Sequence, residues 1–142
     1  MKILFGLLAF CAALLSYPTK SYADMFSAAP TLEQRDIKGA TIFESEEVVM
    51  LMIDGSAIES TKHLHEIFAE ALKLPTSYGK NLDALFDVLT DQTLISKKID
   101  ITIRNGSALT VTLGEDTVDA LLEVLNSAQE ADPNHMSLMY WQ

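Results

Sequence analysis

Apolar residues recur with the periods of strands and helices from residue 48 to the end of the chain. The run 48–53 is apolar, too short for a helix and followed by an Asp-Gly turn, so it predicts a buried strand. In 99–104 isoleucine alternates with polar residues, which is the period of a strand with a buried face. A last strand is expected at 136–141, after an Asp-Pro-Asn sequence that ends the preceding helix.

Three other segments carry apolar residues at helical spacing. The first helix is expected to begin after Ser60, a residue type that caps helices, and to end before Pro75. A shorter helix is expected at 81–89, after a Tyr-Gly turn. The third is expected to have Asp116 or Thr117 as its cap.

Two segments have no clear period. Residues 24–46 show neither the period of a strand nor that of a helix, so we expect a linker or a loosely packed arm there. Within 107–114, a Thr-Val-Thr-Leu run is compatible with an edge strand. The remaining elements alternate, with connections long enough for parallel pairing. They predict one α/β domain at 47–142, in which helices pack against a three-stranded, mostly parallel sheet.

The first 23 residues have the organisation of a secretory signal peptide. Lys2 precedes an apolar run over 3–15, and small residues at 21 and 23 suit cleavage after Ala23. The alternative is a membrane anchor, but this run is shorter than the roughly 20 residues that cross a bilayer. We therefore expect an exported protein, periplasmic or secreted. It would contain no cysteine, because Cys11 leaves with the signal.

Acidic residues outnumber basic ones in the expected mature chain. The sequence has 20 acidic and 10 basic side chains, so removal of Lys2 and Lys20 leaves 8 basic side chains and a formal net charge of −12. Such a surface repels nucleic acid and anionic membranes, and it attracts cationic partners at rates that fall with salt. We expect a basic protein partner, no nucleic-acid binding, no membrane association after signal cleavage and a monomer when free.

Three aspartates, Asp83, Asp87 and Asp91, follow one another at four-residue spacing along the short helix. Since each residue turns a helix by about 100°, neighbours in this series lie about 40° apart and share a face if the helix reaches the third. Like charges at this spacing destabilise a helix by a few tenths of a kcal/mol. The pattern indicates either a solvated acidic face or a display of anions for a cationic cleft, with Phe86 at its margin and Tyr78 just before it.

The segment around the short helix also contains a specific motif. It consists of Leu74-Pro75 and the run Tyr78-Gly79-Lys80-Asn81-Leu82-Asp83-Ala84-Leu85-Phe86-Asp87. This motif resembles that of the barstar family, whose members inhibit barnase-type ribonucleases, and a weaker similarity extends over roughly 48–142. The resemblance implies a barstar-like fold and a non-catalytic inhibitor, which occludes the active site of a basic extracytoplasmic ribonuclease or nuclease toxin with an acidic helix and loop.

The resemblance also implies roles for individual residues. Asp87 corresponds to an aspartate that occupies a phosphate position among the basic side chains of the nuclease, and Asp83 to one that binds nearby. Charge-assisted hydrogen bonds of this kind are among the stronger ones. The other expected partner-binding residues surround these two: Tyr78, Gly79, Asn81, Phe86 and Asp91.

The chain departs from the family pattern at four positions. Ser77 replaces a tyrosine, Phe86 a tryptophan and Asp91 a glycine. An acidic contact on the third helix is replaced by Ser127, with Glu123 and Glu130 a turn away. Because aromatic anchors carry much of the energy of an interface, we expect a nuclease that differs from barnase, or a weaker complex.

Two other functions remain open at this point. One is a secreted acidic binding module, or an immunity protein, for a basic partner that is not a ribonuclease. The other is a hydrolase or metal-binding protein that uses Asp83 with Asp87, but no Gly-rich phosphate loop, nucleophile motif or His/Cys cluster accompanies them. His63 and His65 point about 160° apart on a helix, so one metal cannot take both. We expect surface or partly packed histidines and no cofactor.

Overall fold

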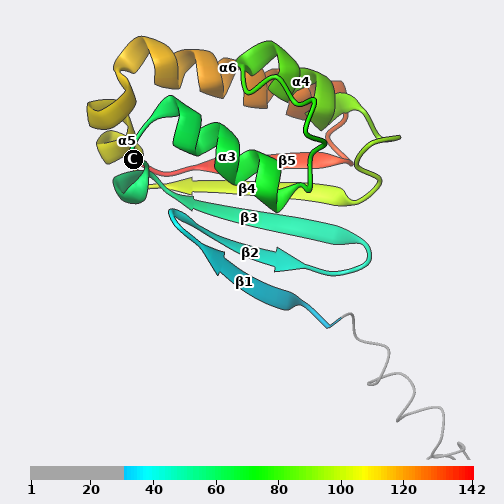
Figure 1. Cartoon of the computed structure of the whole chain (residues 1–142). Helices are drawn as coiled ribbons and strands as arrows, with labels where there is room; N and C mark the ends of the chain where they lie inside the picture. The colour runs from blue at the N-terminus through cyan, green and yellow to red at the C-terminus, as the bar shows by residue number, and fades with distance from the viewer. Residues whose placement is uncertain (1–30) are drawn as a thin grey trace, which may run out of the picture. The chain divides into compact units, whose positions relative to one another are not determined.

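The computed structural model describes residues 31–142, in which helices cover one face of a five-stranded mixed sheet (Figure 1). The strands lie in the order β1-β2-β3-β4-β5, antiparallel from β1 to β3 and parallel from β3 to β5. In chain order the elements are β1 (Glu33–Ile37), β2 (Ala40–Glu44), β3 (Val48–Asp54), the 3-10 helix η1 (Gly55–Ala57), α3 (Thr61–Ala71), α4 (Leu82–Thr90), β4 (Lys98–Arg104), α5 (Gly106–Leu113), α6 (Glu115–Ala131) and β5 (Met136–Tyr140).

The three parallel strands are those that the apolar runs predict, to within a residue or two. In the central register Leu51 of β3 pairs with Ile101 of β4, which pairs with Leu138 of β5. Alternate residues of β3 and β4 are buried, as expected for strands with one face against a core. The expectation of a parallel centre is therefore confirmed.

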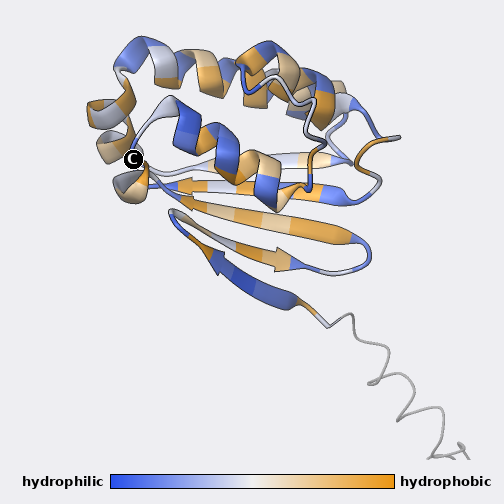
Figure 2. Ribbon diagram, in the orientation of Figure 1, coloured by the Kyte–Doolittle hydropathy of each residue, from blue (hydrophilic) through white to orange (hydrophobic). Residues whose placement is uncertain are grey.

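The expectation of a three-stranded sheet is wrong, because part of the segment expected to be a linker or arm folds as the hairpin β1–β2. Ile37 pairs with Ala40 across a two-residue turn, in which Gly39 has φ +86°, a conformation that glycine adopts without strain. In β2 only Ala40 and Ile42 are fully buried, whereas β1 is largely exposed and hydrophilic (Figure 2). Because so few residues of the hairpin alternate between buried and exposed positions, the sequence shows no clear strand period there. Residues 24–30 and the expected signal peptide lie outside the described residues.

Helix α3 begins where the sequence predicts, and it ends a little earlier than the expected stop before Pro75. The Ser60 side chain caps it by accepting a hydrogen bond from the backbone N–H of His63 at 3.1 Å. Its last residue is Ala71, and Lys73, in the left-handed region with φ +53°, turns the chain toward Pro75. Leu64 and Phe68, which are almost completely inaccessible to solvent, anchor the helix in the core.

The segment 106–113 is the helix α5, not an edge strand. Its Thr110 hydroxyl donates to the carbonyl of Gly106 one turn earlier, and Leu109 is fully buried. Gly106 lies directly under the Tyr140 ring, where a Cβ atom would collide with the ring. The expected cap of the next helix is also wrong: α6 begins at Glu115 after Gly114, whose φ of +88° breaks the path between the two helices.

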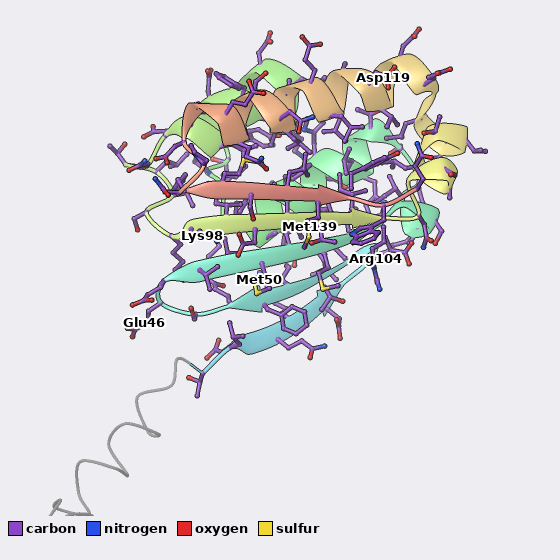
Figure 3. The ribbon with its side chains drawn as sticks, turned by 180° about the vertical axis from the view of Figure 1, so that it is seen from behind. Glu46, Met50, Lys98, Arg104, Asp119 and Met139 are labelled. Carbon is purple, nitrogen blue, oxygen red and sulfur yellow. The ribbon has the colours of Figure 1, made fainter. Side chains whose placement is uncertain are left out.

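The other face of the sheet carries no helix among the described residues (Figure 1). The view from behind shows this face (Figure 3). It carries Met50 of β3, Met139 of β5 and the basic side chains Lys98 and Arg104 of β4. Met139 is 56% exposed, whereas Met136 at the start of the same strand is completely buried. No helix within 31–142 is both long enough and apolar enough to cross a membrane.

Candidate partner-binding surface

Helix α4 is attached to the core by Leu85 and Leu89, which are 0% and 1% exposed. Its first turn is fixed by Asn81, whose side-chain oxygen accepts a hydrogen bond from the backbone N–H of Ala84 at 2.8 Å. The amide group of the same side chain donates to the carbonyl of Gly79 at 3.4 Å. The Gly-x-Asn sequence therefore sets the direction in which α4 leaves the loop.

The outer face of α4 presents two free carboxylates. Asp83 and Asp87 are exposed, one helical turn apart. Within residues 31–142 neither of them forms an ion pair or a side-chain hydrogen bond. Asp83 lies in the first turn, where the helix dipole favours an acid. Asp87 lies one turn further on and does not benefit from the dipole in this way. These two groups have the full hydrogen-bonding capacity of a carboxylate available for another molecule.

Asp91 does not extend this face, because α4 ends at Thr90. Its carboxylate is turned onto its own loop, where it accepts hydrogen bonds from the Thr93 hydroxyl at 2.6 Å and the Thr93 N–H at 2.9 Å. These bonds lower the pKa of Asp91. The sequence predicted a third carboxylate on the helical face if the helix reached it, and the helix stops one residue short.

A hollow of about 500 Å³ lies on the surface where α4 and α6 meet. From α4 it is lined by Asp83, Phe86 and Asp87. From α6 it is lined by Glu123, Val124 and Ser127. The half-buried Phe86 and Val124 supply its apolar surface, and three carboxylates surround them. Glu130, the other acidic residue near Ser127, is not part of its lining.

Tyr78 lies in the core, 8% exposed, although the sequence placed it at the edge of the partner-binding face. A hydrogen bond of 2.7 Å joins its hydroxyl to Nδ1 of His65 on α3, which is 1% exposed. Burial raises the pKa of Tyr78 to about 12. Burial, with a smaller contribution from the charge of Lys80, lowers the pKa of His65. The pair links the loop before α4 to α3.

Sequence reasoning missed the role of His65, which was expected to be a surface or partly packed residue. The available signal was its position beside Leu64 on the predicted helix, at the edge of the buried stripe. His63 is half-buried and points elsewhere: its Nδ1 accepts from the N–H of Glu59 at 3.2 Å, and its Nε2 lies 3.1 Å from the carbonyl of Lys38. Over 31–142 no group of His, Cys, Asp and Glu side chains could hold a metal ion.

Gly79 and Asn81 are exposed in the loop between Tyr78 and α4. Lys80 between them has φ +51°, and its ammonium group lies 3.6 Å from a carboxylate oxygen of Glu66 on α3. This loop therefore presents its backbone beside the exposed start of α4, and its one basic side chain is turned toward α3.

Basic side chains are absent from α4, α5 and α6. Of the eight basic residues within 31–142, seven lie within 4.0 Å of a carboxylate, and none of these carboxylates belongs to α4 or α6. Helix α6 alone carries five acidic residues: Glu115, Asp116, Asp119, Glu123 and Glu130. The net negative charge of the domain is thus concentrated on the two helices that border the hollow.

These features describe a small acidic α/β domain with an uncompensated carboxylate surface on α4 and α6. The family model for Barstar, described as barnase inhibitor, matches residues 48–140. The chain belongs to the barstar family. It is also 35% identical over 80 residues to the protein "Putative ribonuclease inhibitor YrdF" of Bacillus subtilis (strain 168), an alignment that covers 56% of this chain and 85% of that protein. The hairpin β1–β2 precedes the segment that the family model matches.

Proposed function

We propose that this protein inhibits a ribonuclease by inserting the carboxylates of α4 into the positively charged active site. The observation that carries the proposal is the pair Asp83 and Asp87, exposed and without an internal cation, on the helix of a barstar-family domain. Asp87 takes the position of a substrate phosphate and Asp83 binds beside it. The inhibitor is non-catalytic and uses no cofactor.

The chemistry of a ribonuclease active site supports this assignment. Such a site binds the phosphates of RNA through cationic side chains, and a carboxylate accepts the same charge-assisted hydrogen bonds. Concentrated negative charge on one face also steers a basic partner toward that face before contact, so association is fast and sensitive to salt. The protein does not bind nucleic acid, because the same negatively charged face repels RNA. It is a monomer when free.

The surrounding residues have different roles in this proposal. Phe86 provides the aromatic contact at the edge of the carboxylates, and the exposed Gly79 and Asn81 bring the loop backbone to the rim of the nuclease cleft. Tyr78 acts from within, by attaching this loop to His65. Asp91, turned onto its own loop, contributes negative charge at the periphery.

The proposal is tested with protein purified from cells that express the full chain, with barnase as the probe enzyme. Cleavage of a fluorogenic RNA substrate is followed at increasing inhibitor concentration. Loss of a hydrogen bond to a charged group costs about 1.5–3 kcal/mol, so Asp87→Ala should weaken inhibition at least about tenfold. Glu46→Ala removes an exposed carboxylate from the β2–β3 turn and should leave inhibition unchanged. Equal inhibition by wild type and Asp87→Ala would contradict the proposal, and so would a wild type that inhibits neither barnase nor the ribonuclease activity of an envelope extract of the producing cells.

A second candidate is an acidic binding module for a basic partner that is not a ribonuclease. It is favoured by Ser77 and Ser127, which stand where the family pattern has a tyrosine and an acidic residue. Immobilised wild-type protein and its Asp87→Ala variant are incubated with an envelope extract of the producing cells. Capture of a basic protein without ribonuclease activity by wild type alone would support this candidate over the first.

We further propose that the protein is exported, so that it acts in the periplasm or outside the cell. The support is the charge and apolar pattern of residues 1–23. There it would protect the cell from its own exported nuclease or from a nuclease toxin of a competitor. Mass spectrometry of the protein from an envelope fraction should find Asp24 as the first residue. A full-length chain confined to the cytoplasm would contradict export.

A further inference from the structure

The hollow between α4 and α6 contains a carboxylate that α4 does not supply, that of Glu123. We propose that Glu123 is a specificity-determining residue of the partner-binding surface, which pairs with a cationic side chain of the nuclease. It replaces the acidic contact that the family pattern places at Ser127. This inference rests on the proposed function and extends the surface from one helix to two.

Helix geometry and the lining of the hollow distinguish Glu123 from the other nearby acid, Glu130. Glu123 and Ser127 are one turn apart on α6, and both face the hollow. Glu130 has nearly the same azimuth as Glu123 but lies seven residues further on, or about 10 Å along the helix axis. It is exposed and does not line the hollow. Of these two glutamates, only Glu123 therefore lines the same hollow as Asp83 and Asp87.

The chemistry of the hollow fits the end of an arginine or lysine side chain. Phe86 and Val124 offer an apolar surface to the aliphatic stem, and an aromatic ring face also attracts a cation. The carboxylates of α4 and of Glu123 approach the charged end from two helices. No basic residue of α4 or α6 competes for this position. A cation from the partner would meet its counter-charges there without displacing an internal ion pair.

Removal of the Glu123 charge is not expected to harm the fold. Asp119 lies four residues earlier on α6, and like charges at this spacing destabilise a helix. Glu123→Gln removes this repulsion and keeps a good helix former at an exposed position. A loss of inhibition by this variant therefore reports on binding, which a thermal unfolding curve of the same preparation verifies.

The experiment compares Glu123→Gln, Glu130→Gln and Asp87→Ala as inhibitors of barnase, with the association rate measured at low and high salt. We expect Glu123→Gln to weaken inhibition about tenfold and to reduce the salt dependence of association, while Glu130→Gln stays within about twofold of wild type. If Asp87→Ala weakens inhibition but Glu123→Gln matches Glu130→Gln, the inference is overturned and the proposed function stands. If Asp87→Ala equals wild type, or if wild type inhibits neither barnase nor the ribonuclease activity of an envelope extract of the producing cells, both are overturned.

Discussion

The domain has two regions that differ in how their charged side chains are paired. Around α3 and the hairpin β1–β2, cations and anions are interleaved: Arg35 pairs with Glu70 at 3.3 Å and Lys38 with Glu59 at 2.6 Å. On α4 and α6 the acidic residues have no cationic neighbour from their own helices. One domain thus contains a charge-paired region and a carboxylate surface, side by side.

Under the proposed function, this difference marks the surface that meets the ribonuclease. Repulsion between like charges one turn apart costs a helix a few tenths of a kcal/mol per pair, so the carboxylate surface weakens the elements that carry it. In the paired region the same residue types form surface ion pairs that are close to neutral for stability. Acidic residues that lower stability and neutralise nothing internal are expected where the counter-charges come from another molecule.

The largest effect is expected from reversing the charge of the carboxylate surface. The double variant Asp83→Lys/Asp87→Lys would place ammonium groups against the cationic cleft, and like-charge contacts across an interface cost several kcal/mol. We expect inhibition of barnase to weaken by roughly a thousandfold or more. The variant should remain folded, since both residues are exposed and form no internal pair. Circular dichroism checks this.

The matched control is Glu59→Lys/Glu70→Lys, which reverses the same number of charges in the paired region. It breaks the contacts with Lys38 and Arg35, and it should leave inhibition within about threefold of wild type because both residues lie around α3. Equal losses in the two double variants would mean that net charge, rather than a defined surface, governs binding.

The next largest effect is expected at the buried hydrogen bond between Tyr78 and His65, which links the loop before α4 to α3. Tyr78→Phe would leave Nδ1 of His65 buried without its partner, at a cost of about 1–3 kcal/mol in the free energy of unfolding. Tyr140→Phe is the control, because the Tyr140 hydroxyl forms no hydrogen bond among residues 31–142. Urea unfolding measures both. Loss of inhibition by Tyr78→Phe at unchanged stability would place this hydroxyl in the interface instead.

The parts of the fold that could be predicted from sequence are those with sustained periods. β3, β4 and the apolar stripes of α3, α4 and α6 each bury several residues at regular spacing, and these elements were predicted to within a few residues. The hairpin β1–β2 was missed because β1 buries almost none of its residues and carries polar side chains along most of its length. The β-branched residues of α5 favour a strand, whereas the tertiary contacts of Leu109 and Gly106 favour a helix.

The candidate site likewise has features that follow from a local pattern in the sequence and features that depend on tertiary packing. That Asp83 and Asp87 share a face follows from helical spacing alone, and the structure agrees. The burial of Tyr78 could not be predicted, because it depends on a histidine thirteen residues earlier in another helix. The choice between Glu123 and Glu130 depends on how α4 and α6 pack against each other, which no local pattern encodes.

A smaller effect is expected from pH. The pKa of His65 is lowered below its ordinary value of 6.5 by burial. At a pH between the lowered pKa of the folded protein and the ordinary pKa of the unfolded chain, the His65 side chain is protonated in the unfolded chain but not in the folded protein. The free energy of unfolding therefore falls as pH decreases from 6.5 toward the lowered pKa, by at most about 1.4 kcal/mol per pH unit. Urea unfolding between about pH 7.5 and 5.5 measures this slope. His65→Gln should flatten it, and an undiminished slope in that variant would assign the proton to another group.

The smallest effect should come from the paired region itself. The side chains of Arg35 and Glu70 are 43% and 53% exposed, so their ion pair contributes less than about 1 kcal/mol. Glu70→Gln should therefore change neither the unfolding midpoint by more than a few degrees nor the inhibition of barnase. The comparison with Glu123→Gln is direct, because both substitutions remove one exposed helical carboxylate. If Glu70→Gln weakened inhibition as much as Glu123→Gln, the two regions would not differ in function. Local pairing would then be no guide to where this domain binds.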